Sequence, residues 1–426
     1  MDMGIRHALV VVSWATLVAS ATAQAFHVRK PNEYRAAVDD NVATALDAKL
    51  AVGDLTLVSQ GRSGRLRALL AALAVPESSQ TLVFSKTSLQ RHRISPHSPR
   101  AIYFGRDAYV GWVPGAAALE VAVSDAKLGM AFYTVPQDPA TPARFVRDDS
   151  CLSCHATGHS DDEPGVVLRS VFADENGDPI ASAGESNVTM RTPMAERWGG
   201  WLVTGKIDEV HRGNGTAMRG ERGRWRVESR SAVDLGAFAD LFAPTDYLAP
   251  TSDVGALLAL EQQATVHNLL IKAMLQTRCL LQTDREVNAM LGEEGLREST
   301  AEILDDLARK LVTALLMGGE AATTGANATP DARFAADFVA LWPQSADGPR
   351  IGELTVAPRT FSLPLSPMVH SRAFAALPEE LRERVLRQLR RALAKGRLPR
   401  DVQVSKEQRL AIDAHLRATL PGYADG

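Results

Sequence analysis

The segment AIYFGRDAYVGWV, residues 101–113, contains two short runs of β-branched and aromatic side chains. A glycine, an arginine and an aspartate separate the runs, as is typical of strands joined by turns. Similar runs occur upstream, at Leu82–Phe84, and downstream, at Met130–Val135. The sequence therefore predicts several short strands between about Thr81 and Val135.

Helical patterns flank these strands on both sides. Residues 34–75 are rich in Ala, Leu and charged side chains. From Ser252 onward, apolar side chains recur at spacings of three and four residues. Further helices are expected from a capping box at Ser299 and Glu302, and after Pro378. We expect the α+β class, with a β-containing middle flanked by helical segments.

The first residues have the pattern of a secretory signal peptide. Arg6 and His7 precede an apolar run, residues 8–19, and two A-x-A cleavage sites follow. The run is shorter than the ~20 residues of a membrane span, so we expect a soluble chain exported to the periplasm, with no membrane span after cleavage. The predicted units are a signal peptide at 1–23 (cleaved after 23 or 25), an N-terminal helical segment at 24–80, a β-containing domain at 81–250 and a helical C-terminal region at 251–426.

Charge and cysteine usage exclude several classes of protein. The 426 residues include 47 Lys and Arg against 50 Asp and Glu, a formal net charge of −3, so we expect no nucleic-acid partner. There are three cysteines. Cys279 stands alone in an apolar helical pattern and is expected to be a buried structural thiol. A disulfide framework is not expected, and the closely spaced pair needs another explanation.

That pair lies in Cys151-Leu152-Ser153-Cys154-His155, which matches the C-x-x-C-H pattern of c-type haem attachment. Each thiol adds to one haem vinyl group, and the adjacent histidine binds the iron. We expect one covalent haem c on Cys151 and Cys154, with His155 as an axial iron ligand, so the β-containing middle at 81–250 is the expected haem c-binding domain. The alternatives are a redox-active thiol pair, a zinc site that includes His159, or a chance match with free thiols.

The second axial ligand has several candidates. Met190 is the first, because it lies in a polar loop C-terminal to the motif. Met194 follows it closely, and His267 and His211 are the histidine alternatives. Each of them could equally be an ordinary buried residue.

Other residues could contact the porphyrin. Arg147 and Arg197 flank the motif in the sequence and could pair with the haem propionates. Trp198 could pack against the porphyrin edge. Solvated arginines and a core tryptophan are the competing interpretations.

Several blocks together resemble a family of large exported bacterial cytochromes with a single c-type haem motif. The likeness covers about residues 80–275. The resemblance implies haem binding through Cys151, Cys154 and His155, and electron transfer in the periplasm; it supplies no substrate. The blocks are residues 84–90, 99–104, 109–112, 145–147, 196–201 and 211–214.

Two functions are compatible with these features. In the favoured one, the chain is an electron carrier rather than an enzyme, and it docks periplasmic redox partner proteins. In the alternative, the haem is open on one side, and the chain is a gas sensor or a peroxidase-like haem oxidoreductase. The alternative requires a distal acid or base, such as His211 or His267.

Overall fold

The computed structural model describes residues 24–323, 329–346 and 348–424. The predicted signal peptide, residues 1–23, lies outside the described residues.

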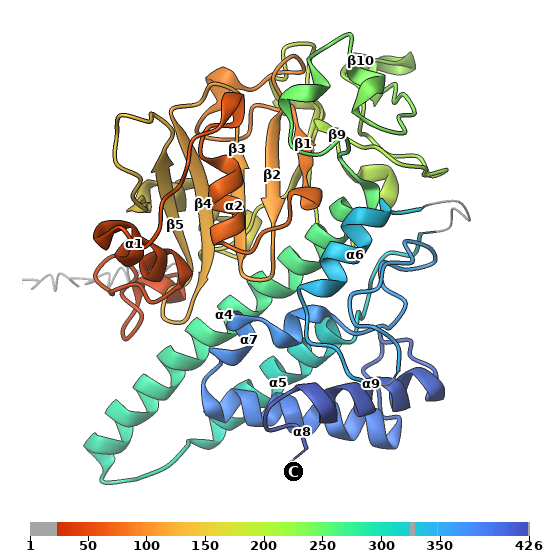
Figure 1. Cartoon of the computed structure of the whole chain (residues 1–426). Coiled ribbons are helices and arrows are strands. Elements are labelled where there is room, and N and C mark those ends of the chain that lie inside the picture. Colours follow the sequence, from red (N-terminus) through yellow and green to blue (C-terminus); the bar gives the residue numbers. More distant parts are fainter. Residues whose placement is uncertain (1–23, 324–328, 347, 425–426) are drawn as a thin grey trace, which may run out of the picture.

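The main sheet is antiparallel and has seven strands, and it lies in the upper part of the molecule in the view of Figure 1. Its strand order is β6-β5-β4-β3-β2-β1-β9. Two small hairpins, β7-β8 and β10-β11, accompany it. The strands are β1 (Thr81–Val83), β2 (Arg100–Phe104), β3 (Ala108–Trp112), β4 (Ala118–Asp125), β5 (Gly129–Pro136), β6 (Val146–Arg147), β7 (Arg169–Val171), β8 (Glu185–Asn187), β9 (Trp201–Leu202), β10 (Ala217–Arg219) and β11 (Trp225–Val227).

The helices occupy both ends of the chain, and in Figure 1 α5, α8 and α9 lie together below the sheet. They are α1 (Val42–Val52), α2 (Leu66–Ala72), α3 (Leu152–His155), α4 (Val254–Leu291), α5 (Glu298–Leu315), α6 (Ala332–Ala340), α7 (Arg372–Ala375), α8 (Glu379–Lys395) and α9 (Lys406–Thr419).

The long helix α4 packs against one face of the sheet. His267 lies beside Tyr109 of β3, and Ile271 lies against Gly129 at the start of β5. Nearly every side chain of the first half of α4 is buried. The first half of α4 therefore lies in the interior, although it includes the polar side chains of Glu261, Gln262 and Gln263. The helix contacts both β5 of the sheet and α5 of the C-terminal region.

The structure confirms the α+β class and the strands predicted in residues 101–113, which form β2 and β3. The predicted capping box at Ser299 is wrong, because α5 begins at Glu298 and no side chain caps it. The N-terminal helical segment is interrupted between α1 and α2. Gly53, at the end of α1, has a φ of 83°, a conformation that ends a helix.

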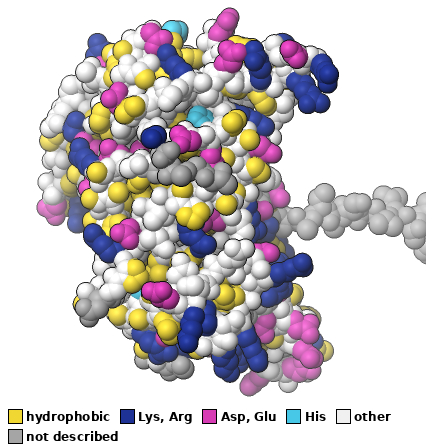
Figure 2. Space-filling model, turned by 90° about the vertical axis from the view of Figure 1, so that its right-hand side faces the viewer, with side chains coloured by type: hydrophobic (Ala, Val, Ile, Leu, Met, Phe, Trp, Pro, Cys, Tyr) yellow, Lys and Arg dark blue, Asp and Glu magenta, His cyan; other side chains and the backbone are white. Residues whose placement is uncertain are grey.

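Within the described ranges, no helix is long and apolar enough to cross a bilayer. Figure 2 shows one face of the molecule, on which acidic, basic and hydrophobic side chains are interspersed. That face offers no broad field of one sign, in keeping with the nearly balanced composition.

Candidate haem-attachment site

Cys151, Cys154 and His155 lie in one short helical turn that follows β6. A 3-10 turn, Asp149–Cys151, continues into α3. Asp148 begins the turn, since its carboxylate accepts a hydrogen bond from the Ser150 amide at 3.0 Å. Positions i, i+3 and i+4 share a face of a helix. The motif residues therefore project from one side of the turn.

The ring of His155 is held in one orientation. Its Nδ1 lies 2.8 Å from the Gly165 carbonyl oxygen. A carbonyl only accepts hydrogen bonds, so Nδ1 carries the proton and Nε2 keeps its lone pair. Burial lowers the pKa of His155, which favours the neutral ring that a metal requires.

Two neighbours reinforce that orientation. The Phe132 ring of β5 lies 4.8 Å from the His155 ring, centroid to centroid. Asn268 of α4 exchanges two hydrogen bonds of 2.8 Å with the Val166 backbone, next to Gly165. Hydrogen bonds behind a ligating histidine fix its tautomer and its direction. The contacts behind His155 are of this kind.

The cysteine environment disfavours a thioredoxin-like pair. All three cysteines are free thiols. Burial, followed by the negative charge of Asp148, raises the pKa of Cys151 to about 12. A redox-active pair needs a stabilised thiolate, and here the thiolate is disfavoured. Cys279 is buried, as the sequence predicted.

The zinc alternative also lacks support. The Nε2 atom of His159 lies 3.3 Å from the Glu185 carboxylate. In the part of the chain that the structure describes, no three His, Cys, Asp or Glu side chains gather as metal ligands. The two thiols therefore have no evident zinc-binding partners.

The sheet presents a half-buried strip beside His155. Ile102, Gly111, Glu120 and Thr134 are successive cross-strand partners and so point to one face. Ile102, Glu120 and Thr134 of this set are only half-buried, although their strands are central. Phe132, on the same face, contacts His155. A flat apolar group attached to the motif would cover this strip.

A polar feature of the strip fits a haem. Arg100 of β2 lies flat over Gly111, where a Cβ atom would come within 2.3 Å of the guanidinium. Its Nη2 donates to Glu120 at 2.5 Å, and its buried Nε has no partner among the described residues. The site thus combines a strip of mixed polarity, which includes Ile102, Glu120 and Thr134, with a guanidinium Nε–H that has no acceptor among the described residues.

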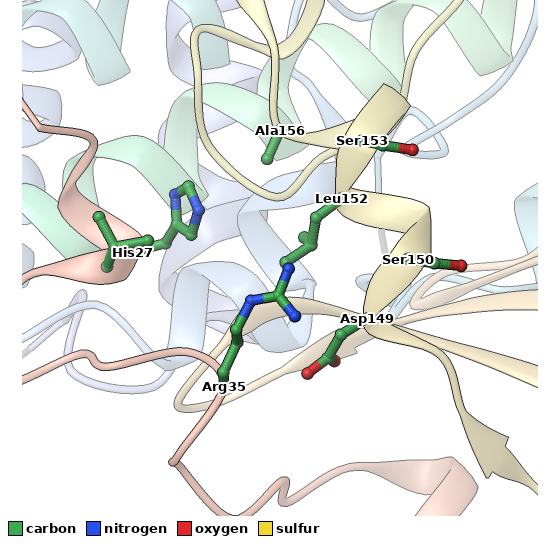
Figure 3. Close-up of a pocket in the computed structure, with 8 residues that line it drawn as sticks. His27, Arg35, Asp149, Ser150, Leu152, Ser153 and Ala156 are labelled. Atoms are coloured by element: carbon green, nitrogen blue, oxygen red, sulfur yellow. The ribbon is translucent and has the colours of Figure 1, made fainter.

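A cavity near the motif lies behind the attachment turn (Figure 3). It has a volume of about 400 Å³. Figure 3 shows Arg35 and Asp149 close together on one side and His27 on another. Neither the two cysteines nor His155 line it. This cavity therefore lies away from the ligating side chains. It is lined by His27, Val28, Arg35, Asp149, Ser150, Leu152, Ser153 and Ala156.

The two arginines predicted to bind propionates make protein contacts instead. Arg147 donates to the carbonyl oxygens of Tyr34 at 2.7 Å and Ala37 at 2.9 Å, and to the Asp149 carboxylate at 2.9 Å. It holds the N-terminal segment against β6. Arg197 is buried and donates to the Glu261 carboxylate at 2.6 Å.

Trp198 belongs to the same buried cluster as Arg197. Its Nε1 donates to Glu261 at 2.6 Å, and its ring borders a cavity of about 10 Å³ together with Trp201. A cavity of that size holds at most about one water molecule. Trp198 is therefore a core residue that orients a buried acid.

The four candidates for the second axial position are all wholly or largely buried, and they differ in their partners. Met190 and Met194 belong to the hydrophobic core. The His211 ring packs against Trp198 at 5.3 Å, and its Nδ1 accepts from the Gly213 amide. Burial lowers its pKa to about 4.

His267 differs from the other candidates, because one ring nitrogen is unsatisfied. Its Nδ1 lies 3.0 Å from the Tyr109 hydroxyl. Its buried Nε2 has no hydrogen-bond partner within the described ranges. Burial lowers its pKa to about 3. Such an unpartnered nitrogen in the interior is costly unless a ligand or metal binds it.

Sequence reasoning did not assign Phe132, Gly165, Asn268 or Arg100 to the site. No sequence signal links Gly165 or Asn268 to His155, because tertiary packing brings them together. Arg100 and Gly111 both lie in blocks that carried the family resemblance. Their position in those blocks is the sequence feature that could have pointed to them as site residues.

Comparisons with protein-family models, curated proteins and solved structures found no match.

Proposed function

We propose that this chain is an exported c-type cytochrome, with one covalent haem c, that transfers electrons between periplasmic redox proteins. The observation that carries the proposal is the geometry of the attachment turn. Two thiols and a histidine share one side of it, and the Gly165 carbonyl keeps the proton of His155 on Nδ1. A C-x-x-C-H turn with a free Nε2 is what haem c attachment requires.

Each residue of the attachment site would have a separate role in holding the haem. Cys151 and Cys154 would form the thioether links, and His155 would bind the iron through Nε2. When bound, the haem supplies a one-electron couple. Phe132 and Asn268 would keep the His155 ring from turning, which fixes the ligand field.

His267 is the histidine best supported as the second ligand. Its Nε2 is buried and unpartnered within the described ranges, whereas the Nδ1 of His211 accepts a backbone hydrogen bond. A sixth protein ligand would make the haem an electron carrier. An iron left open on one side would favour the haem oxidoreductase or gas sensor.

The test is expression in a bacterial periplasm together with haem-attachment machinery. We expect haem that stays on the polypeptide after denaturation, and its loss in Cys151→Ala or Cys154→Ala. Cys279→Ala is the matched control and should keep the haem. A wild-type chain that is exported and folded without covalent haem would refute the proposal.

Carbon monoxide then distinguishes the two functions. A reduced spectrum that carbon monoxide leaves unchanged indicates six-coordinate iron and supports electron transfer. In that case His267→Ala should make the iron reactive toward carbon monoxide, whereas His211→Ala should not. Rapid binding to the wild-type protein would instead support the open-site oxidoreductase.

A further inference from the structure

Arg100 is built into the sheet as an incompletely paired cation. Its guanidinium lies over Gly111, the only residue type that leaves the space, and Nη2 reaches Glu120. Nε is buried and has no partner among the residues described. An unsatisfied buried donor is unfavourable. The Nε–H group of Arg100 therefore lacks a protein acceptor within the described residues, as do those of Arg65, Arg169, Arg372 and Arg384; Arg100 differs from them in lying on the sheet face that meets the attachment turn.

The pair formed by Arg100 and Glu120 lies on the sheet face that meets the attachment turn. Arg100 is two residues from Ile102 in β2, and Phe132 is two residues from Thr134 in β5, so both side chains point to the same face as Glu120. On that face the Phe132 ring contacts His155. Both charges therefore lie on the face of the sheet that meets the predicted iron ligand.

The attachment chemistry decides which part of a haem would reach this pair. The thioether links lie at the vinyl edge of the porphyrin, and the two propionates lie at the opposite edge. A porphyrin that extends from Cys151 and Cys154 past His155 over the half-buried strip directs its propionates away from the turn, along the sheet. A guanidinium is suited to binding a carboxylate through two parallel N–H groups.

We propose that Arg100 binds a haem propionate through its Nε edge while it keeps Glu120 on Nη2, and that these two opposite charges set the reduction potential. This inference rests on the proposed function. In this proposal Arg100 binds the propionate in place of Arg147 and Arg197. The guanidinium groups of those two arginines already donate to carbonyl and carboxylate oxygens of the protein.

The test compares reduction potentials of the haem-loaded protein, measured by spectroelectrochemistry across pH. Arg100→Gln removes a positive charge that favours ferrous iron, so its potential should be lower than that of the wild type. Glu120→Gln removes a negative charge, so its potential should be higher. Arg67→Gln is the matched control, because Arg67 of α2 pairs with Glu77 in the same manner and should leave the potential unchanged.

A second readout reports on the propionate itself. Loss of its cationic partner raises the pKa of a carboxylate. The spectral titration attributed to a propionate should therefore move to higher pH in Arg100→Gln and return toward the wild-type position in Arg100→Lys. Non-specific damage to the fold would not produce opposite potential shifts in the two single variants.

The outcomes separate the two proposals. A wild-type chain without covalent haem overturns the proposed function, and this inference falls with it. A haem-loaded wild type whose Arg100→Gln variant has the same potential and titration as Arg67→Gln overturns only the role of Arg100. Potential shifts of opposite sign together with the raised propionate titration support it.

Discussion

The buried pair formed by Arg197 and Glu261 permits a sharp prediction for Arg197→Met. Their side chains are 2% and 3% exposed. Besides Glu261, the guanidinium donates to the carbonyl oxygens of Thr192 and Met190. Methionine fills similar volume but leaves the carboxylate with Trp198 as its remaining side-chain donor among the described residues. Removing one partner of a buried pair costs about 3–5 kcal/mol.

The penalty should depend on pH. Burial already raises the pKa of Glu261, and the Arg197 charge opposes that rise. Without Arg197 the folded-state pKa rises further above the unfolded value. A carboxyl group whose pKa is raised on folding binds its proton more tightly in the folded state, so stability is lost as pH increases. The destabilisation should therefore be smaller at pH 5 than at pH 8.

The assay is denaturant unfolding of the wild type and Arg197→Met at both pH values. Arg230→Met is the control, because Arg230 and Asp240 form an exposed pair whose loss should cost at most about 1 kcal/mol. Glu261→Gln added to Arg197→Met should recover part of the loss. A penalty below about 1 kcal/mol, or one equal at both pH values, would refute the reasoning.

Three further predictions concern single contacts. Gly111→Ala should displace the Arg100 guanidinium, lower the reduction potential as Arg100→Gln does, and change unfolding free energy by less than about 1 kcal/mol, since the clash is with a flexible side-chain end. Asn268→Ala should cost about 1–3 kcal/mol by leaving backbone groups beside the attachment turn unpaired; an unchanged melting temperature would contradict this. The Nε2 atoms of His370 and His415 lie 3.2 Å apart, and burial, with the neighbouring positive charges, lowers the pKa of His370 to about 4. Because that value is below the unfolded one, stability should fall by on the order of 3 kcal/mol between about pH 6.5 and 4, and His370→Phe should reduce that fall in denaturant titrations.

The sequence predicted that the three residues of the motif would lie together. The spacing of Cys151, Cys154 and His155 needs only one helical turn to place the three side chains together, and the structure supplies that turn. The strands β2 and β3 were likewise predicted correctly, since their β-branched and aromatic runs are short and end at Gly and Asp. Both predictions depend only on residues that are close together in the sequence.

The sequence did not reveal the roles of arginine side chains whose partners lie far away along the chain. Arg147 and Arg197 flank the motif in the sequence, but the Ala37 carbonyl bound by Arg147 and the Glu261 carboxylate bound by Arg197 come from distant segments. Arg100 lies some fifty residues before the motif, yet the sheet places it on the face where Phe132 contacts His155. Separation along the chain is a poor guide to such contacts.

The sequence by itself determined the α+β class and predicted the attachment chemistry, because hydrophobic periodicity and a five-residue motif are encoded locally. Only the tertiary structure decided the tautomer of His155, which depends on the carbonyl of Gly165 and on its support from α4. It also decided that Arg100 lies on the sheet face that meets the attachment turn. Both depend on packing between strands and helices far apart in the chain, and local pattern does not specify which of them meet.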